Sequence, residues 1–255
     1  MTRVDTIRYF GTDSNLVALH GFASTGQQFA SFSDTLGRPI SAPDLPGHGR
    51  SADADCQYHS VFGQLSEQLP SGAPLLGYSQ GARLSVAGVA LRYLHPSALI
   101  LISGTAGIED ETEREARLAA DNKLAEHILE IGLERFVEEW TSTGLTSLTH
   151  LPQDKRAEDH AIRLENTPEG LAAAIRGYGQ GSLPAVWRKL DAINIPVLVV
   201  VGRRDRKYSE IGQAMTDAIG SNASLTIIES SNHNPMLDQP DTLAEAISEF
   251  LDRNG

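Results

Sequence analysis

The sequence predicts an α/β fold in which helices cover both faces of a doubly wound, mostly parallel sheet, with a helical cap inserted between two strands. Three observations support this prediction. Short apolar runs without polar alternation are typical of parallel strands buried on both faces. Segments with helical spacing separate several of these runs, as expected for alternating strands and helices. The segment 108–190, by contrast, carries only helical patterns.

The elements follow in chain order. Six apolar runs are candidate strands: Leu16–Leu19, Ile40–Ala42, Leu75–Leu76, Ala98–Ile102, Val197–Val201 and Leu225–Ile228. The helical patterns between and after them lie at Val61–Leu69, Gln80–Leu94, Ile211–Ile219 and Leu243–Leu251. The inserted block has further helical patterns at Glu109–Ile131, Phe136–Trp140, Asp154–Leu164 and Glu169–Tyr178. We therefore predict a core of residues 1–107 and 191–255 and a cap of residues 108–190; a peripheral helical layer without a ligand role is the alternative.

Composition restricts the partners. The 255 residues carry a formal net charge of −12, which disfavours nucleic acid and anionic membrane surfaces as ligands. The single cysteine, Cys56, excludes an intrachain disulfide and favours a reducing compartment. Residues 1–6 lack the apolar stretch of a signal peptide, and no segment approaches the roughly 18 apolar residues of a membrane span. We expect a cytoplasmic protein without stable membrane association; the sequence does not indicate its oligomeric state.

Ser79 is the most informative residue, because it lies between two glycines after an apolar run and before a helical pattern. The stretch Gly77–Gly81 has the G-x-S-x-G spacing of the nucleophile elbow of the α/β-hydrolase fold. In such an elbow a strand turns sharply into a helix, and a side chain at either glycine would collide with a neighbouring strand or helix. A plain strand-to-helix turn is the alternative when this motif is considered alone.

Two later residues have the chain order that this fold requires. A serine hydroxyl is a weak nucleophile or base unless a histidine activates it and a carboxylate orients that histidine. Asp205 follows the run Val197–Val201, and His233 follows Leu225–Ile228, in the order serine, acid, histidine. Each alone could be an ordinary loop residue, but the three together predict a catalytic triad. The other histidines and the competing acids Asp44 and Asp238 do not lie at the required places.

The loop after the first clear strand predicts an oxyanion hole. Leu19–Phe22 contains a His-Gly pair, and in this fold that loop and the residue after the nucleophile each supply a backbone N–H. Those amides belong to Phe22 and Gln80. We interpret His20 as a buried, hydrogen-bonded loop residue and Asp44–Ser51 as scaffold without a chemical role.

Taken together, the His-Gly pair, the Asp-Leu-Pro-Gly-His-Gly stretch and the Gly-Tyr-Ser-x-Gly stretch resemble the corresponding elements of the α/β-hydrolase superfamily. A narrower resemblance follows from Arg83, four residues after Ser79. Gly77–Arg83 resembles the corresponding segment of the 2-succinyl-6-hydroxy-2,4-cyclohexadiene-1-carboxylate synthase family. Further similar segments run to the C-terminus; they contain Arg117, Phe136–Trp140, Arg163, Gly202–Tyr208 and His233-Asn234.

This resemblance implies a lyase of menaquinone biosynthesis that eliminates pyruvate from a substrate with several carboxylates. Guanidinium groups bind carboxylates bidentately. The resemblance therefore implies a small polycarboxylate partner and no cofactor or metal ion, and no metal-ligand cluster is visible. The residues it implies for substrate binding are Arg83, Arg117, Arg163, Trp140 and Tyr78.

Alternatives remain open at this stage. Arg83 could form an ion pair with a cap glutamate, Arg117 and Arg163 could be solvated helix residues, and Trp140 and Tyr78 could be packing residues. The same triad could also serve a serine carboxylic-ester hydrolase that works through an acyl-enzyme. A non-catalytic binding protein is a third possibility, which the complete set of serine, acid and histidine disfavours.

Overall fold

A mostly parallel sheet lies at the centre of the chain. In this computed structural model residues 6–12 and 15–254 are described, and they form a seven-stranded sheet of order β1-β3-β2-β4-β5-β6-β7. Only β1 pairs antiparallel; the other five pairings are parallel. The strands are β1 (Ile7–Phe10), β2 (Leu16–Leu19), β3 (Ile40–Pro43), β4 (Leu75–Tyr78), β5 (Leu99–Ile102), β6 (Val197–Gly202) and β7 (Ala223–Ile228).

The side chains of the central strands alternate between two hydrophobic clusters, one on each face of the sheet. On β2, Val17 and Leu19 belong to one cluster, whereas Leu16 and Ala18 belong to the other. This alternation follows from the two-residue period of a strand. Both clusters are covered by helices, so all four positions are buried. The predicted buried parallel sheet is therefore confirmed.

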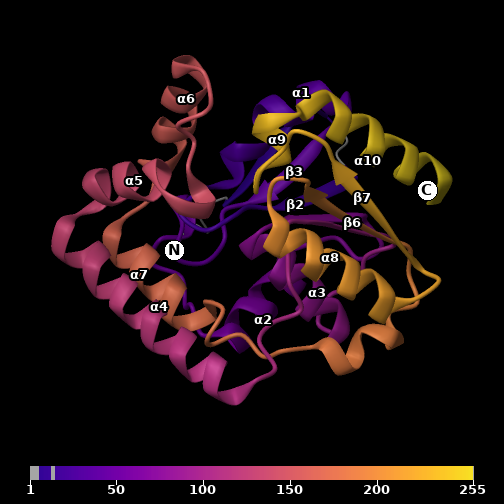
Figure 1. Ribbon diagram of the computed structural model, residues 1–255, viewed down its shortest axis with the longest axis horizontal. Coiled ribbons are helices and arrows are strands. Elements are labelled where there is room, and N and C mark those ends of the chain that lie inside the picture. Colours follow the sequence, from indigo (N-terminus) through magenta and orange to yellow (C-terminus); the bar gives the residue numbers. More distant parts are fainter. Residues whose placement is uncertain (1–5, 13–14, 255) are drawn as a thin grey trace.

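Helices pack on both faces of the sheet (Figure 1). The first cluster contains apolar residues of α2 (Tyr58–Gln68), α3 (Gln80–Ala90) and α8 (Arg206–Ile219). The second contains residues of α1 (Ala30–Leu36), α9 (Pro235–Asp238) and α10 (Pro240–Asn254). Short 3-10 helices lie at η1 (Gly26–Phe29), η2 (Gly49–Ser51), η3 (Gly144–Thr146) and η4 (Trp187–Ala192).

The segment between β5 and β6 is helical, as its sequence pattern indicates. It contains α4 (Glu111–Ile131), α5 (Leu133–Ser142), α6 (Gln153–Arg163) and α7 (Pro168–Tyr178), which group together at one side of the sheet (Figure 1). Asp110 caps α4 by accepting a hydrogen bond from the Glu113 amide at 2.8 Å, and Pro168 begins α7. No helix in the described part of the chain is long and apolar enough to cross a membrane.

Strand β1 and helices α1 and α9 were not expected from the sequence. Strand β1 is a four-residue edge strand, and its pattern is atypical because the charged Arg8 is buried while Tyr9 is exposed. Helix α1 is short, and its apolar residues are Phe32 and Leu36. One predicted helix also ends early: α3 stops at Ala90 because Arg92 has a left-handed φ of 63°.

Candidate active site

Ser79 stands at the sharp turn between β4 and α3, with φ 50° and ψ −105°. The flanking glycines permit this turn. A Cβ at Gly77 would lie 2.6 Å from the Ala82 backbone, and a Cβ at Gly81 would lie 2.0 Å from the Leu19 carbonyl oxygen. Both distances are far below van der Waals contact, so the predicted collisions are confirmed. The turn leaves the Ser79 side chain at the carboxyl end of the parallel strands.

His233 lies between Ser79 and Asp205 in one line of hydrogen bonds. Its Nδ1 is 2.7 Å from Asp205 Oδ2, and its Nε2 is 3.0 Å from Ser79 Oγ. An ionised carboxylate only accepts hydrogen bonds, so Nδ1–H donates to Asp205 and leaves Nε2 free to accept the Ser79 proton. His233 and Asp205 are both buried, and Asp205 also accepts a hydrogen bond from the Tyr208 amide at 3.2 Å. The structure thus brings the three predicted residues together in the geometry of a triad.

Two buried histidines shape the loop that carries Phe22. The Leu45 amide donates to His20 Nε2 at 2.9 Å, and the Ala23 amide donates to His48 Nε2 at 3.4 Å. Burial lowers the pKa of His20 to about 4 and the pKa of His48 to about 3, so both rings are neutral and can accept these bonds at pH 7. The structural interpretation of His20 is confirmed.

The amides of Phe22 and Gln80 remain available for a ligand. No hydrogen bond among the described residues uses either N–H group. Gln80 is the first residue of α3, where backbone amides have no partner within the helix. Both residues belong to the segments next to Ser79, as an oxyanion hole requires.

Ser79 and His233 line an open cavity of about 440 Å³. One part of its lining is apolar and comes from Phe22, Leu124, Phe136, Trp140 and Ile175. The charged part contains three cations, Arg83, Arg117 and Lys207. Glu139 also lines the cavity, but its carboxylate is bound by His127 and Arg135. The cavity therefore suits a ligand that combines an apolar body with negative charges.

Arg83 is a buried cation that no carboxylate of the described residues contacts directly, although the nearby Asp121 favours its charged form. Its side chain forms no ion pair among the described residues, and its buried Nη1 has no hydrogen-bond acceptor there. Burial lowers the pKa of Arg83 below its ordinary value, and the nearby Arg117 adds repulsion. The expected alternative, an ion pair with a cap glutamate, is not formed. A guanidinium in this position is costly unless an anion enters the cavity.

Comparison with known proteins agrees with this geometry. Residues 16–246 match the model of the alpha/beta hydrolase family. The chain is 33% identical to a Bacillus subtilis (strain 168) protein whose name gives 2-succinyl-6-hydroxy-2,4-cyclohexadiene-1-carboxylate synthase as its provisional activity, with 98% of this chain and 97% of that protein covered. The chain belongs to this synthase family within the alpha/beta hydrolases.

Two further relatives support the assignment to the synthase family. The 2-succinyl-6-hydroxy-2,4-cyclohexadiene-1-carboxylate synthase of Yersinia pestis (strain Pestoides F) is 25% identical, over 94% of this chain and 88% of that protein. The solved structure of MenH from S. aureus superimposes with a TM-score of 0.90 at 28% identity, covering 98% of this chain and 99% of that chain.

The structure brings two of the three predicted arginines to the cavity. Arg117, on α4, is held at Nε by Asp121 Oδ1 at 2.7 Å and lines the cavity with Arg83. Arg163 does not line this cavity. Its guanidinium binds both carboxylate oxygens of Asp159, at 2.5 and 3.2 Å, and donates to the carbonyls of Phe22 and Ala23 at 3.4 and 3.3 Å. Of the three arginines that the resemblance implies for substrate binding, only Arg83 and Arg117 therefore line this cavity.

The two predicted aromatic residues occupy different places. Trp140 lines the cavity, with its ring centroid 5.5 Å from that of Phe22. Tyr78 does not line it; its ring lies 5.8 Å from that of His233 and belongs to a neighbouring, smaller pocket. Burial raises the pKa of Tyr78 above its ordinary value, so the hydroxyl stays protonated.

Sequence reasoning missed several cavity residues. Tyr208 packs its ring 4.6 Å from that of His233, Lys207 precedes it, and Gln180 binds Arg117 through its side-chain oxygen. Lys207 and Tyr208 lie two and three residues after Asp205, at the start of α8 and within the similar segment Gly202–Tyr208, which could have indicated that they lie near the site. Nothing in the sequence around Gln180 indicated a site. Among the described residues no three histidine, cysteine or acidic side chains form a group that could hold a metal ion.

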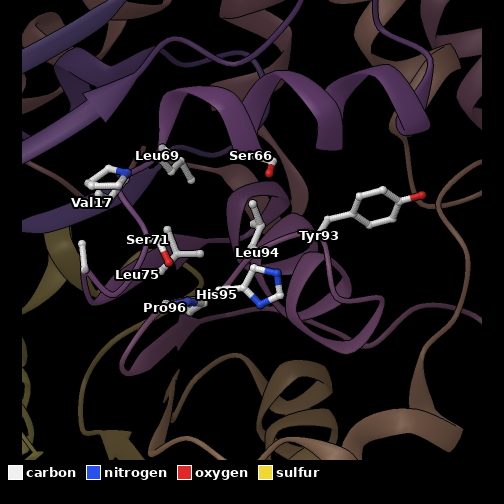
Figure 2. A pocket seen from close by; sticks show the side chains of 11 residues that line it. Val17, Ser66, Leu69, Ser71, Leu75, Tyr93, Leu94, His95 and Pro96 are labelled. Atoms are coloured by element: carbon white, nitrogen blue, oxygen red, sulfur yellow. The ribbon is translucent and has the colours of Figure 1, made fainter.

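A second cavity lies at the amino ends of the parallel strands, opposite to the carboxyl ends where Ser79 stands. Figure 2 shows its lining, which includes Val17 and Leu75 near the amino ends of β2 and β4 together with Leu69, Tyr93 and Leu94. Its volume is about 80 Å³, and no arginine, lysine or acidic residue of the described chain lines it. It contains neither the triad nor the cationic residues, so we assign the site to the cavity at Ser79.

Proposed function

We propose that the protein eliminates pyruvate from 2-succinyl-5-enolpyruvyl-6-hydroxy-3-cyclohexene-1-carboxylate and forms 2-succinyl-6-hydroxy-2,4-cyclohexadiene-1-carboxylate in menaquinone biosynthesis. The observation that carries this proposal is the buried, unpaired Arg83 in the same cavity as Ser79 and His233. A buried cation beside the reacting serine favours a substrate with carboxylates over a neutral ester. The names of the relatives support the same activity.

The proposed reaction begins with removal of a ring proton. Ser79 gives its own proton to His233 Nε2 and takes the proton from the ring carbon, while Asp205 stabilises the resulting imidazolium. The electron pair left on the ring delocalises onto the succinyl ketone oxygen. The Phe22 and Gln80 amides would hold that oxyanion, and each donor of this kind is worth roughly 3 kcal/mol.

The second step completes the diene. The electron pair returns from the oxyanion and forms a ring double bond at the deprotonated carbon. The existing ring double bond shifts by one position, and this shift breaks the ring C–O bond to the enolpyruvyl group. The leaving enolate of pyruvate takes the extra proton of the His233 imidazolium, which restores the neutral imidazole; the Ser79 hydroxyl has already been restored by the ring proton. No oxidant or reductant is needed, because the elimination leaves the electron count unchanged.

Arg83 and Arg117 are the proposed carboxylate ligands, and Trp140 is the proposed contact for the apolar part of the substrate. Residues 108–190 act in this proposal as the cap, since α4 and α5 supply Arg117 and Trp140 to the cavity. The contacts of Arg163 and Tyr78 favour a role in supporting the Phe22 loop rather than in binding substrate. Arg163 donates hydrogen bonds to the carbonyls of Phe22 and Ala23. The ring of Tyr78 packs against Gly21, so closely that a Cβ at Gly21 would lie 2.8 Å from it.

Pyruvate release from the proposed substrate, coupled to lactate dehydrogenase, tests this function. We expect turnover by the wild type and a loss of at least about 10³-fold in kcat for Ser79→Ala, because the base is removed. Absence of pyruvate with the wild type would reject the lyase. A burst of p-nitrophenol from short acyl esters, together with indifference to Arg83→Ala, would instead favour an ester hydrolase that uses the same triad.

A further inference from the structure

Gln180 lies in a tight loop after α7, between two glycines that press against α4. A Cβ at Gly181 would lie 2.4 Å from Leu118 Cα, and a Cβ at Gly179 would lie 2.7 Å from Asp121 Oδ2. The Gly181 amide also donates to Asp121 Oδ2 at 3.0 Å. This close approach fixes the loop on the helix that carries Arg117, so the Gln180 side chain has little freedom to lie elsewhere.

The buried Gln180 side chain contacts both sides of the cavity. Its Oε1 accepts a hydrogen bond from Arg117 Nη1, and its Nε2 reaches the Tyr208 hydroxyl at 3.4 Å. Tyr208 in turn packs against the His233 ring. Gln180 therefore connects the arginine of the inserted segment with the part of the core that carries the triad histidine.

The neutral amide has a specific consequence for Arg117. Asp121 already binds Nε with a full negative charge, while Nη2 has no acceptor among the described residues. A glutamine oxygen orients the guanidinium without adding a second negative charge. A glutamate of the same shape would join Asp121 to give the group around Arg117 a net negative charge, which repels a carboxylate.

We propose that Gln180 is a positioning residue that aims Arg117 at a substrate carboxylate while it keeps the charge of Arg117 available. This inference rests on the proposed function, because it names how the same cavity binds its anion.

Two substitutions at Gln180 distinguish this role from a structural one. We expect Gln180→Leu to raise KM about tenfold, because one hydrogen bond to a charged group is lost. We expect Gln180→Glu to raise KM more than Gln180→Leu, at a melting temperature equal to or above that of the wild type. A merely structural role predicts the reverse order of the two KM values, since glutamate still accepts a hydrogen bond from Arg117 and leucine does not. Should Gln180→Leu not fold, the glutamate variant still decides, and a KM near the wild-type value would overturn the proposal.

A double-mutant comparison tests whether Gln180 acts through Arg117. In an Arg117→Met background, Gln180→Glu should change KM less than about twofold, because the group that it positions is absent. Independent, additive losses would contradict the proposal. Gln213→Glu is the matched control; Gln213 is exposed on α8 and donates to Asp217 at 2.9 Å, so KM should stay at the wild-type value.

A binding measurement separates this inference from the proposed function. If the wild type releases no pyruvate, the proposed function fails, and calorimetric titration with succinate then tests Gln180 alone. We expect the wild type to bind succinate about tenfold more tightly than Gln180→Glu does. Equal affinities, or no binding by the wild type, would overturn the proposal.

Discussion

Two buried arginines, Arg163 at the Phe22 loop and Arg83 in the cavity at Ser79, have opposite environments. Arg163 and Arg83 are 6% and 7% exposed, so burial does not distinguish them. Arg163 has a bidentate carboxylate partner and two carbonyl acceptors, whereas Arg83 has a buried Nη1 with no acceptor among the described residues. The acceptors of a buried arginine, rather than its depth, therefore indicate whether it stabilises the fold or is available to bind a ligand.

The largest effect on stability should come from Arg163→Met. This substitution leaves Asp159 buried without its counter-charge, and breaking a buried ion pair in this way costs about 3–5 kcal/mol. Urea unfolding should show a loss of this size at pH 7. A free energy of unfolding within 1 kcal/mol of the wild type, a bound of about the size of a surface effect, would contradict the structural role of Arg163.

Arg83→Met should show the opposite pattern. Removing an unpaired buried cation should leave the free energy of unfolding unchanged or raise it. At the same time kcat/KM for the proposed substrate should fall about 100-fold, because a charge-assisted contact to a carboxylate is lost. Steady-state kinetics and urea unfolding of the same preparation check both parts. A marked loss of stability with unchanged kinetics would show that Arg83 has a structural role after all.

Local sequence predicts some of these features and not others. The elbow at Ser79 is predictable because its glycines act within five residues, and chain order then locates Asp205 and His233. The role of Arg163 depends on Asp159, four residues earlier on the same helix, and on loop carbonyls distant in sequence. The i, i+4 pair was readable in the sequence, but the loop contacts follow only from the tertiary fold.

Strand β1 and the position of Gln180 could not be predicted from the sequence for the same reason: each depends on a contact with a residue distant in sequence. Strand β1 depends on Arg8, whose burial is compensated by two hydrogen bonds to Asp44 at 2.8 Å. Gln180 depends on the packing of its loop against α4. Neither partner lies near in sequence, so a pattern of local hydrophobicity cannot reveal them.

The two buried histidines near the Phe22 loop, His20 and His48, should make the free energy of unfolding depend on pH. His20 and His48 have folded pKa values of about 4 and about 3, below the ordinary value of 6.5. Below about pH 6.5 the unfolded chain binds protons that the folded chain does not, so stability is complete above that pH and falls towards pH 4. We expect a decrease of a few kcal/mol between pH 7 and pH 4.5 in urea unfolding.

A substitution identifies the source of this pH dependence. His48→Asn should be less stable than the wild type at pH 7. The slope of its free energy of unfolding against pH should correspond to about one proton fewer taken up on unfolding. An unchanged slope would contradict the assignment of that proton to His48.

The smallest effect on activity should come from a substitution in the apolar cavity at the amino ends of the strands. Ser66 lines it from an exposed position on α2 (Figure 2), and Ser66→Leu places an apolar side chain there. We expect kcat and KM to stay within about twofold of the wild type, since surface changes of this kind rarely exceed 0.5 kcal/mol. A larger loss of activity would mean that this cavity is coupled to the site at Ser79.

The central claim is that Arg83 binds a carboxylate of the substrate, and binding without turnover tests it most directly. In a Ser79→Ala background the dissociation constant of the proposed substrate can be measured by calorimetry. We predict that adding Arg83→Met raises Kd by about 10- to 100-fold, as expected for one charge-assisted contact. An unchanged Kd would contradict the claim, because the unpaired guanidinium would then have no part in binding the substrate.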